Sequence, residues 1–495
     1  MLRYPTMTLA AGLTLAAMTA VPAGAQDAGA LVDALVRKGI LTDDEAKEIR
    51  TEMKKDFAET SAGKIKLSDS LTELKLYGDL RLRYQYDNKD VQEDPPGTGF
   101  DDDRSPSGAQ RSRWRFRLRL NADFKLGKTV FGGVELQTAI ASDSANQTFE
   151  NGFSDYPIFI SKAYLGWKPT DWLTVTGGKV PNPFYTTDLV WDPDINPTGL
   201  TEHIAFHKLF STDEKEGDSK GGYSKDGKTV APAPYERPWE LTLIAGQFIF
   251  DDNLEGGGRD PGETDNDRTT DSYLFQTQLV GSYKFSKDVK LTVAPGWMVY
   301  NAASAIDLEN ENRFEDIDGV SGAQRNLNIL LLPGDLTFKI AGVKTKFFWD
   351  VAYNLEGRKR VEDIYDVLER NNVRDDPDDL QESSFRDRIA WLAGVQFGEN
   401  KKAGDWSLMA NYRETGLGSV DPNLNDSDFA QGELNTRGFK LGLAYNLTDF
   451  AVLGVTYFQA FDLRDDLIGG QATRGNAIAD SNEVQVFQVD LNVKF

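Results

Sequence analysis

The chain of 495 residues contains no cysteine and only two histidines. Without cysteine, neither a disulfide framework nor a thiolate metal site can form. His203 and His207 stand four residues apart in a segment that reads as a strand, so they are roughly 13 Å apart and cannot chelate one metal ion. No nucleotide-binding or nucleophile motif is placed on a suitable strand–helix unit. We therefore expect no enzyme activity, no metal centre and no resident cofactor.

Positive charge is in deficit, since 55 Lys and Arg face 78 Asp and Glu, for a formal net charge of -23. This balance argues against nucleic acid as a partner, because phosphate binding needs a basic surface. After the N-terminus no run of 18 apolar residues occurs, which excludes a transmembrane helix. The mean hydropathy of -0.46 still permits a membrane barrel, whose strands alternate apolar and polar residues.

The N-terminus has the pattern of an export signal. Arg3 precedes an apolar or small stretch from Met7 to Val21, and Ala23-Gly24-Ala25 fits a cleavage site. We predict a signal peptide at 1–25, a periplasmic helical stub and linker at 26–70, and a barrel domain at 71–495.

The predicted stub is helical in pattern. Leu31, Leu35 and Val36 share one helical face, and Gly39 ends that turn. Thr42 and Glu45 have the spacing of a capping box. We favour a tether or a trimerising stub as its role, and cell-wall attachment is the alternative.

Residues 111–120, RSRWRFRLRL, alternate strictly between arginine and mostly apolar side chains. A period of two is that of a β-strand, whose successive side chains point to opposite faces. A charge facing lipid near the midplane costs roughly 2–4 kcal/mol, so in a membrane the arginines must face water. This pattern predicts one wall of an aqueous pore. The residues we expect there are Arg111, Arg113, Arg115, Arg117 and Arg119, with Arg81 and Arg83 on the adjacent strand.

Sixteen segments alternate over the length of a membrane strand, an even number as expected of a single-chain barrel. They are 74–86, 111–126, 129–141, 157–168, 171–180, 199–210, 238–250, 271–285, 288–300, 325–340, 343–356, 385–398, 405–415, 434–447, 450–463 and 483–495. Short turns alternate with long polar loops, as on the two rims of such a barrel. The connection 211–237 is long where a short turn is expected. It is either an insertion or the sign of a further strand pair, so the prediction is an all-β, 16-stranded antiparallel transmembrane β-barrel, with 18 strands as the alternative.

The last strand ends on Phe495, which shares a face with Phe487, Val489, Leu491 and Val493. This ending looks like the C-terminal signature by which outer-membrane barrels are recognised for assembly. The resemblance implies the barrel assembly machinery as a partner and Phe495 as the assembly signal.

Three stretches, ALVDALVRKGILTDDEAKEI, YGDLRLRY and NPFYTTDLVWDPDINPTGL, resemble the bacterial "putative porin" family. The resemblance implies a helical stub ahead of a trimeric-porin-like barrel, a homotrimer in the cell outer membrane, and a passive channel of unspecified solute. A weaker similarity is to phosphate-selective porins.

The loop 181–198 is rich in proline and aromatic residues, unlike the Gly- and Asp-rich loops elsewhere. It is the third loop on the long-loop rim, the position at which porins fold a loop into the barrel. We predict that it folds inward as a constriction and that Asp188, Asp192 and Asp194 face the arginine wall across a transverse field. The alternative is an ordinary rim loop whose aspartates cap turns.

Acidic loops at 101–104, 265–271 and 375–379 lack the spacing of an EF-hand. We expect them to be solvated, with loosely bound calcium bridging to lipopolysaccharide as the alternative.

Together these patterns predict an outer-membrane channel for passive diffusion of small polar solutes, anion-favouring through its arginines and surrounded by lipid and lipopolysaccharide. The alternatives are a phosphate- or oligosaccharide-selective porin and, less favoured, an outer-membrane adhesin or enzyme.

Overall fold

The structure of the protein is a computed structural model. The residues that this structure describes are Val32, 35–49, Thr51, Ser68, 70–91, 109–139, 144–149, 152–153, 155–209, 222–223, 229–230, 237–251, 272–301, 327–362, 384–432, 434–464 and 481–495. The predicted signal peptide at 1–25 and the acidic loops at 101–104, 265–271 and 375–379 lie outside these residues. The chain forms two compact units, Met1–Ser68 and Asp69–Phe495.

The smaller unit contains the predicted helical turns. Gly39 has a φ of 69°, the left-handed conformation that ends a helix, and its amide donates to the Val36 carbonyl at 2.9 Å. The Thr42 amide donates to the Glu45 carboxylate at 2.8 Å, and the Glu45 amide donates to the Thr42 hydroxyl at 3.3 Å. The predicted capping box is therefore confirmed. No helix among the residues placed by the structure is both long and apolar enough to cross a membrane.

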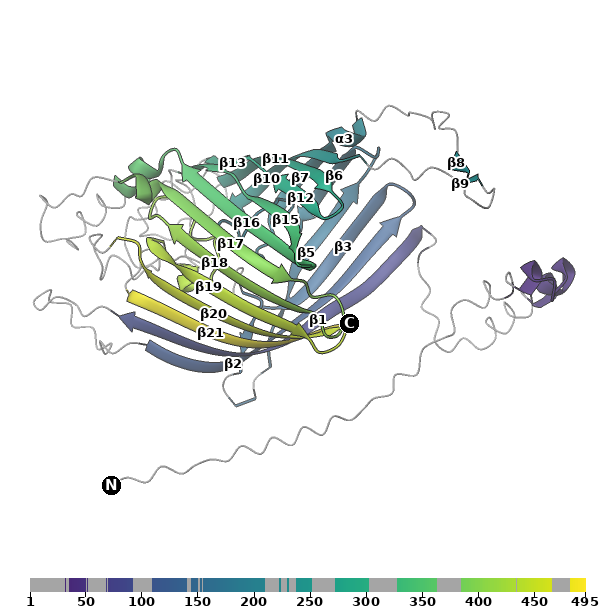
Figure 1. The fold of residues 1–495 in the computed structure, drawn as a ribbon, viewed down its shortest axis with the longest axis horizontal. Helices are drawn as coiled ribbons and strands as arrows, with labels where there is room; N and C mark the ends of the chain where they lie inside the picture. Colours follow the sequence, from purple (N-terminus) through teal and green to yellow (C-terminus); the bar gives the residue numbers. More distant parts are fainter. Residues whose placement is uncertain are drawn as a thin grey trace, which may run out of the picture. The chain divides into compact units, whose positions relative to one another are not determined.

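The larger unit is a closed antiparallel barrel in which each strand pairs with its neighbours in the sequence (Figure 1). Its wall consists of β1 (Leu71–Val91), β2 (Ala109–Leu126), β3 (Val130–Thr138), β5 (Ile158–Trp167), β6 (Leu173–Lys179), β7 (Thr198–Ala205), β10 (Trp239–Asp251), β11 (Ser272–Ser286), β12 (Val289–Val293), β13 (Gly296–Asn301), β14 (Asn328–Leu331), β15 (Gly334–Ile340), β16 (Val343–Asn354), β17 (Ile389–Gly398), β18 (Trp406–Thr415), β19 (Thr436–Asn446), β20 (Ala451–Asp462) and β21 (Ser481–Lys494).

These segments form sixteen wall strands. Pro295 separates β12 from β13, and Pro333 separates β14 from β15, because proline has no amide to donate to a ladder. Each pair of segments is one interrupted strand: both halves of the first pair with β11, and both halves of the second pair with β16. The two-residue β4 (Gln147–Thr148) only extends the edge of β2. The predicted count of sixteen is confirmed, and the alternative of eighteen strands is wrong.

The long connection between β7 and β10 is an insertion at the rim of short turns. It contains α3 (Phe206–Leu209) and a small hairpin of β8 (Gly222–Tyr223) and β9 (Thr229–Val230). The two hairpin strands pair with each other and form a sheet separate from the barrel. The insertion therefore adds residues without adding wall strands. His207 consequently lies in α3 rather than in a strand.

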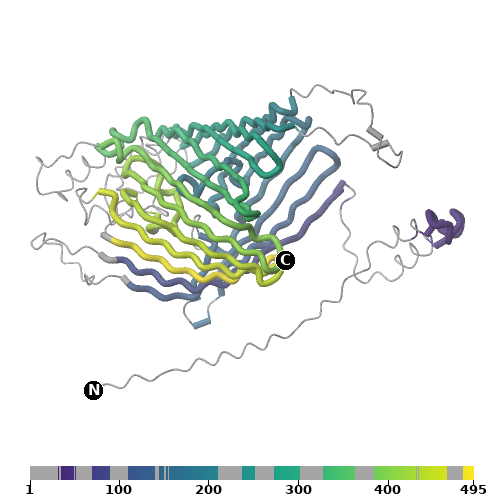
Figure 2. Tube along the Cα trace, viewed as in Figure 1, coloured from purple at the N-terminus to yellow at the C-terminus, as the bar shows by residue number. Residues whose placement is uncertain are grey.

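The barrel closes where the last strand pairs with the first, and Figure 2 shows the yellow C-terminal strand beside the purple N-terminal one. Phe495 and Gly78 exchange both backbone hydrogen bonds, at 2.9 and 3.0 Å. A Cβ on Gly78 would come within 2.4 Å of the Arg119 carbonyl and 2.8 Å of the Phe495 ring. Glycine is thus required where the terminal ring packs against the seam.

Candidate functional site

The chain leaves the barrel wall after β6, and we call residues 180–197 the internal loop. Pro181 and Pro183 come within three residues of Val180 and cannot supply the amides of a continuing strand. The Val180 amide donates to the Pro197 carbonyl at 2.8 Å, so the two ends of the loop are held together at the wall.

The apolar side chains of the internal loop are buried inside the barrel. Leu189, Val190 and Trp191 are each no more than 2% exposed. The Phe184 and Trp191 rings both pack against Phe248 of β10, with centroids 6.1 and 6.4 Å away. Complete burial of one such side chain contributes about 1.5–3 kcal/mol, which is a sufficient reason for the loop to fold inward.

Polar groups of the internal loop reach strands on the other side of the ring. The Thr187 hydroxyl donates to Asp350 of β16 at 2.8 Å. The Asp188 carboxylate accepts from Arg413 of β18 at 2.7 Å and from Lys440 of β19 at 2.6 Å. Because these strands are far from β6 and β7 in the wall, the loop crosses the interior of the barrel.

A second segment between β18 and β19, residues 416–432 with 434 and 435, also lies inside the barrel, and we call it the second inward loop. Its Leu424 carbonyl accepts from the Asp192 amide at 2.6 Å. Its Asp426 amide donates to the Asp188 carbonyl at 3.0 Å, and its Ser427 amide donates to the Asp192 carboxylate at 3.2 Å. The two loops therefore support one another.

The sequence pattern predicts only a long polar rim loop between these two strands. The feature that distinguishes the second inward loop is a set of apolar residues recurring through that polar stretch. Leu417, Val420, Leu424 and Phe429 are all buried. Rim loops in water have no reason to carry so many large apolar side chains.

The arginines predicted at the pore wall lie in register on β1 and β2, where Arg81 is opposite Arg117 and Arg83 is opposite Arg115. We call Arg81, Arg83, Arg113, Arg115, Arg117 and Arg119 the arginine cluster. Arg111, the remaining predicted residue, is exposed near the start of β2.

Most of the arginine cluster is paired with carboxylates. Asp79 of β1 accepts from Arg117 at 2.7 Å and from Arg119 at 2.6 Å. Asp194 of the internal loop lies 3.8 Å from Arg117 and 3.9 Å from Arg119. One carboxylate from the wall and one from the loop thus face the same two guanidiniums.

Arg83 and Arg113 have partners of their own. Arg83, only 3% exposed, donates to Asp490 of β21 at 2.7 Å and lies 3.1 Å from Asp428 of the second inward loop. Arg113 lies 3.0 Å from Asp87. One carboxylate of the last strand and one of the second inward loop therefore pair with the same arginine of the cluster, Arg83.

Arg81 and Arg115 differ from the others, because within the described part of the chain neither has a carboxylate within 4 Å. Arg115 is 4% exposed and donates to Gln85 and Ser144, each at 3.2 Å. Arg81 donates to the Asn146 side chain at 2.5 Å. The Nε atoms of both arginines are buried and have no hydrogen-bond partner among the residues that the structure places. Among those residues, the groups that contact these two guanidiniums are neutral.

Only one of the three predicted loop aspartates faces the arginine cluster. Asp194 does so, whereas Asp188 pairs with Arg413 and Lys440, and Asp192 accepts from Ser427. The prediction that all three face the arginines is wrong, because an irregular loop has no repeat that assigns its side chains to one side. Lys440, Arg413 and Asp426 are site residues that sequence reasoning missed.

The carboxyls between the two loops have shifted pKa values. Burial, together with the neighbouring Asp426, raises the pKa of Asp192 to about 8. Burial likewise raises the pKa of Asp426 to about 7. Burial also opposes ionisation of Asp188, but Arg413 and Lys440 outweigh it and hold the pKa of Asp188 well below its usual value. The loop contact thus contains one firmly ionised carboxylate and two that resist ionisation.

Within the described ranges no group of three or more acidic or histidine side chains is arranged to hold a metal ion.

Comparison with known proteins gives one family and several structural neighbours. The family model described as "Putative porin" matches residues 15–316 and 341–495. No curated protein sequence matches the chain.

Among solved structures, the complex of Salmonella typhi OmpF with daunomycin has a TM-score of 0.42 at 9% identity, covering 87% of this chain and 100% of that one. Pseudomonas putida OprB at high pH has a TM-score of 0.42 at 10% identity, covering 85% and 94%. A triple mutant of Rhodopseudomonas blastica porin has a TM-score of 0.36 at 10% identity, covering 86% and 100%.

Proposed function

The chain belongs to the "Putative porin" family and is an outer-membrane porin, and we propose that its channel passes small polar solutes by passive diffusion and favours anions. The observation that carries the anion preference is the pair Arg81 and Arg115, whose guanidiniums have no carboxylate partner among the described residues. A charge held in a largely buried site without a counter-charge attracts a mobile ion of opposite sign.

The charge balance of the interior supports a modest preference. The six guanidiniums of the arginine cluster are matched by five carboxylates, those of Asp79, Asp87, Asp194, Asp428 and Asp490. Among the residues that the structure describes, one positive charge is therefore in excess on that side.

Across the interior, Arg413 and Lys440 pair with Asp188, which is firmly ionised, and with Asp426, whose raised pKa of about 7 leaves it only partly ionised at neutral pH. The proposed field thus comes from a local excess at Arg81 and Arg115 rather than from an uncompensated wall of arginines.

The size of the solute follows from the two loops. A barrel of sixteen strands is wide enough for an aqueous lumen. The internal loop and the second inward loop contact each other within it. We infer that they narrow the lumen to a path beside the arginine cluster. We propose that this path admits small polar solutes and excludes large ones.

The test is the reversal potential of the full chain in a planar bilayer under a gradient of potassium chloride. We expect the wild type to favour chloride and the double variant Arg81→Gln with Arg115→Gln to lose most of that preference. The glutamines keep hydrogen-bonding groups for Asn146, Ser144 and Gln85 while removing both charges. Arg358→Gln is the matched control, because Arg358 pairs with Glu362 at an exposed position. Cation preference in the wild type, or an unchanged reversal potential in the double variant, would contradict the proposal.

A further inference from the structure

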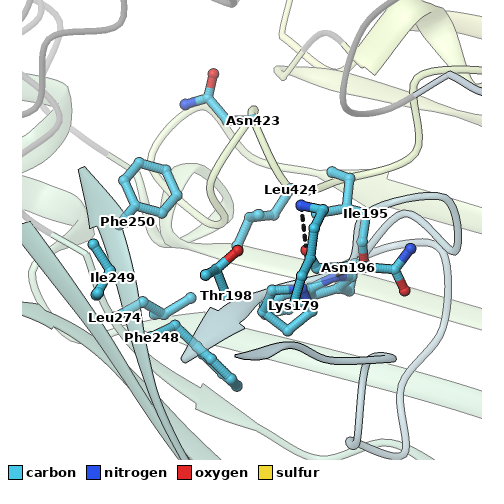
Figure 3. Close-up of a pocket in the computed structure, with 12 residues that line it drawn as sticks. Lys179, Ile195, Asn196, Thr198, Phe248, Ile249, Phe250, Leu274, Asn423 and Leu424 are labelled. Atoms are coloured by element: carbon cyan, nitrogen blue, oxygen red, sulfur yellow. Dashed lines mark hydrogen bonds between the residues drawn. The ribbon is translucent and has the colours of Figure 1, made fainter. Parts of the chain in front are cut away.

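A cavity lies beside the foot of the internal loop, between the loop-side ends of the strands and the second inward loop. Its volume is about 210 Å³, smaller than the roughly 300–1,000 Å³ that takes a drug-sized ligand, so it fits a ligand of one ring. Figure 3 shows Lys179, Asn196 and Thr198 on one side and Phe248, Phe250 and Leu274 on the other.

One side of the cavity is polar and offers groups with unused hydrogen-bonding capacity. The Thr198 hydroxyl makes no hydrogen bond to any residue that the structure describes. The Asn196 side chain donates to Ser161 at 2.8 Å, which fixes the amide and leaves its oxygen as an acceptor. Lys179 donates to the Asn196 carbonyl at 3.0 Å, the dashed line of Figure 3, so this ammonium already has a protein partner.

The second inward loop closes the cavity with Asn423 and Leu424. The Asn423 amide nitrogen donates to Asp421 at 2.9 Å, which holds the side chain in one orientation. Its amide oxygen has almost no accessible surface, so it does not face the cavity, and Asn423 closes this side without offering a free acceptor.

The other side is apolar and rigid. Phe250 packs edge to face against Tyr300, with ring centroids 5.0 Å apart, and Leu274 is 1% exposed. Of the described residues that line the cavity, none is a carboxylate and Lys179 is the one cation. A ligand here must have an apolar face, several hydroxyl groups around its edge and no need of a charged partner.

We propose that this cavity is a binding subsite for one neutral sugar ring, a pyranose such as glucose. A pyranose combines an apolar face of C–H groups, which suits Phe250, with hydroxyls that donate to Asn196 and accept from Thr198. The inference rests on the proposed channel, since the sugar reaches the cavity as a solute passing the two loops. The weak binding of such a site slows a passing sugar without trapping it.

Saturation-transfer NMR on the detergent-solubilised full chain tests the subsite without any conductance measurement, with glucose as ligand and open-chain sorbitol as the matched polyol. We expect a saturable signal for glucose and none for sorbitol, which lacks the ring face. Phe250→Ala removes the apolar platform, and Thr198→Val removes the hydroxyl without changing the shape of the side chain. Each variant should raise the half-saturating glucose concentration by roughly two- to tenfold.

Phe275→Ala is the control, because Phe275 is the exposed neighbour of Leu274 on the opposite face of β11 and should titrate as the wild type. Equal signals for glucose and sorbitol, or wild-type titrations for both Phe250→Ala and Thr198→Val, would overturn the inference. A protein that binds glucose but shows no anion preference in the bilayer would refute the proposed selectivity and leave the subsite intact.

Discussion

Asp188 is the residue through which the internal loop is tied to the far wall, and Asp188→Asn tests whether that tie holds the constriction. The carboxylate accepts from both Arg413 and Lys440, at 2.7 and 2.6 Å. An asparagine of the same size retains one acceptor oxygen and loses the charge. The change therefore removes electrostatic attraction while leaving the packing of the loop unaltered.

The magnitude follows from the exposure of the partners. The Asp188 side chain is 21% exposed, that of Arg413 is 3% and that of Lys440 is 18%. Exposed ion pairs contribute about 0–1 kcal/mol, whereas breaking a fully buried pair costs about 3–5 kcal/mol. For this partly screened triad we expect a loss of about 2–3 kcal/mol, which shifts the ratio of anchored to released loop by roughly 30- to 150-fold.

The assay is single-channel recording of wild type and Asp188→Asn under identical salt. Other contacts, such as Thr187 with Asp350, remain, so we expect a larger mean conductance with excess open-channel noise rather than loss of the barrel. Asp171→Asn is the matched control, because the Asp171 side chain is 94% exposed and its contact with Lys168 is 3.9 Å long. If conductance and noise in Asp188→Asn equal those of the wild type, the loop is not held by this contact and the reasoning fails.

Two further predictions concern the loop contact and the barrel seam. The raised pKa values of Asp192 and Asp426 mean that the folded loops bind more protons than the unfolded chain does. The contact between the loops is therefore strongest at acidic pH and weakens as pH rises through about 7 to 8. We expect open-channel noise to increase from pH 6 to pH 9 and Asp192→Asn to flatten that dependence; noise that does not change with pH would refute the prediction. Gly78→Ala should lower the fraction of heat-modifiable, folded barrel on gels, because its Cβ would come within 2.8 Å of the Phe495 ring and 2.4 Å of the Arg119 carbonyl. Gly127→Ala is the comparison, because its Cβ would meet open space and its cost comes only from a φ of 60°. A wild-type folded fraction in Gly78→Ala would contradict the role of the seam contact.

The wall of the barrel was predictable from the sequence because its information is local. Each strand alternates with a period of two, and one face must be apolar wherever it meets lipid. The arginine run at 111–120 therefore identified β2, and the sixteen alternating segments correspond to the sixteen wall strands. The segments at 288–300 and 325–340 each appear as two shorter strands, since a proline interrupts the ladder without changing the alternation.

The ion pairs within the barrel were not predictable in the same way. Arg83 pairs with Asp490, 407 residues away, and Asp188 pairs with Lys440, 252 residues away. Alternation predicts which side chains point into the barrel, but it does not predict which of those side chains contact one another. For that reason the arginine run looked like an unpaired positive wall, whereas four members of the arginine cluster have carboxylates within 4 Å.

The sequence by itself determined the number of wall strands, the face of each strand and the capping box of the N-terminal unit, because all three depend on residues a few positions apart. Tertiary structure alone decided that the second inward loop joins the internal loop and that Asp194 is the one predicted loop aspartate beside the arginines. It also decided that Arg81 and Arg115 have no carboxylate within 4 Å among the described residues. These outcomes depend on contacts between distant segments, which form only when the barrel closes and brings its interior side chains to a common space.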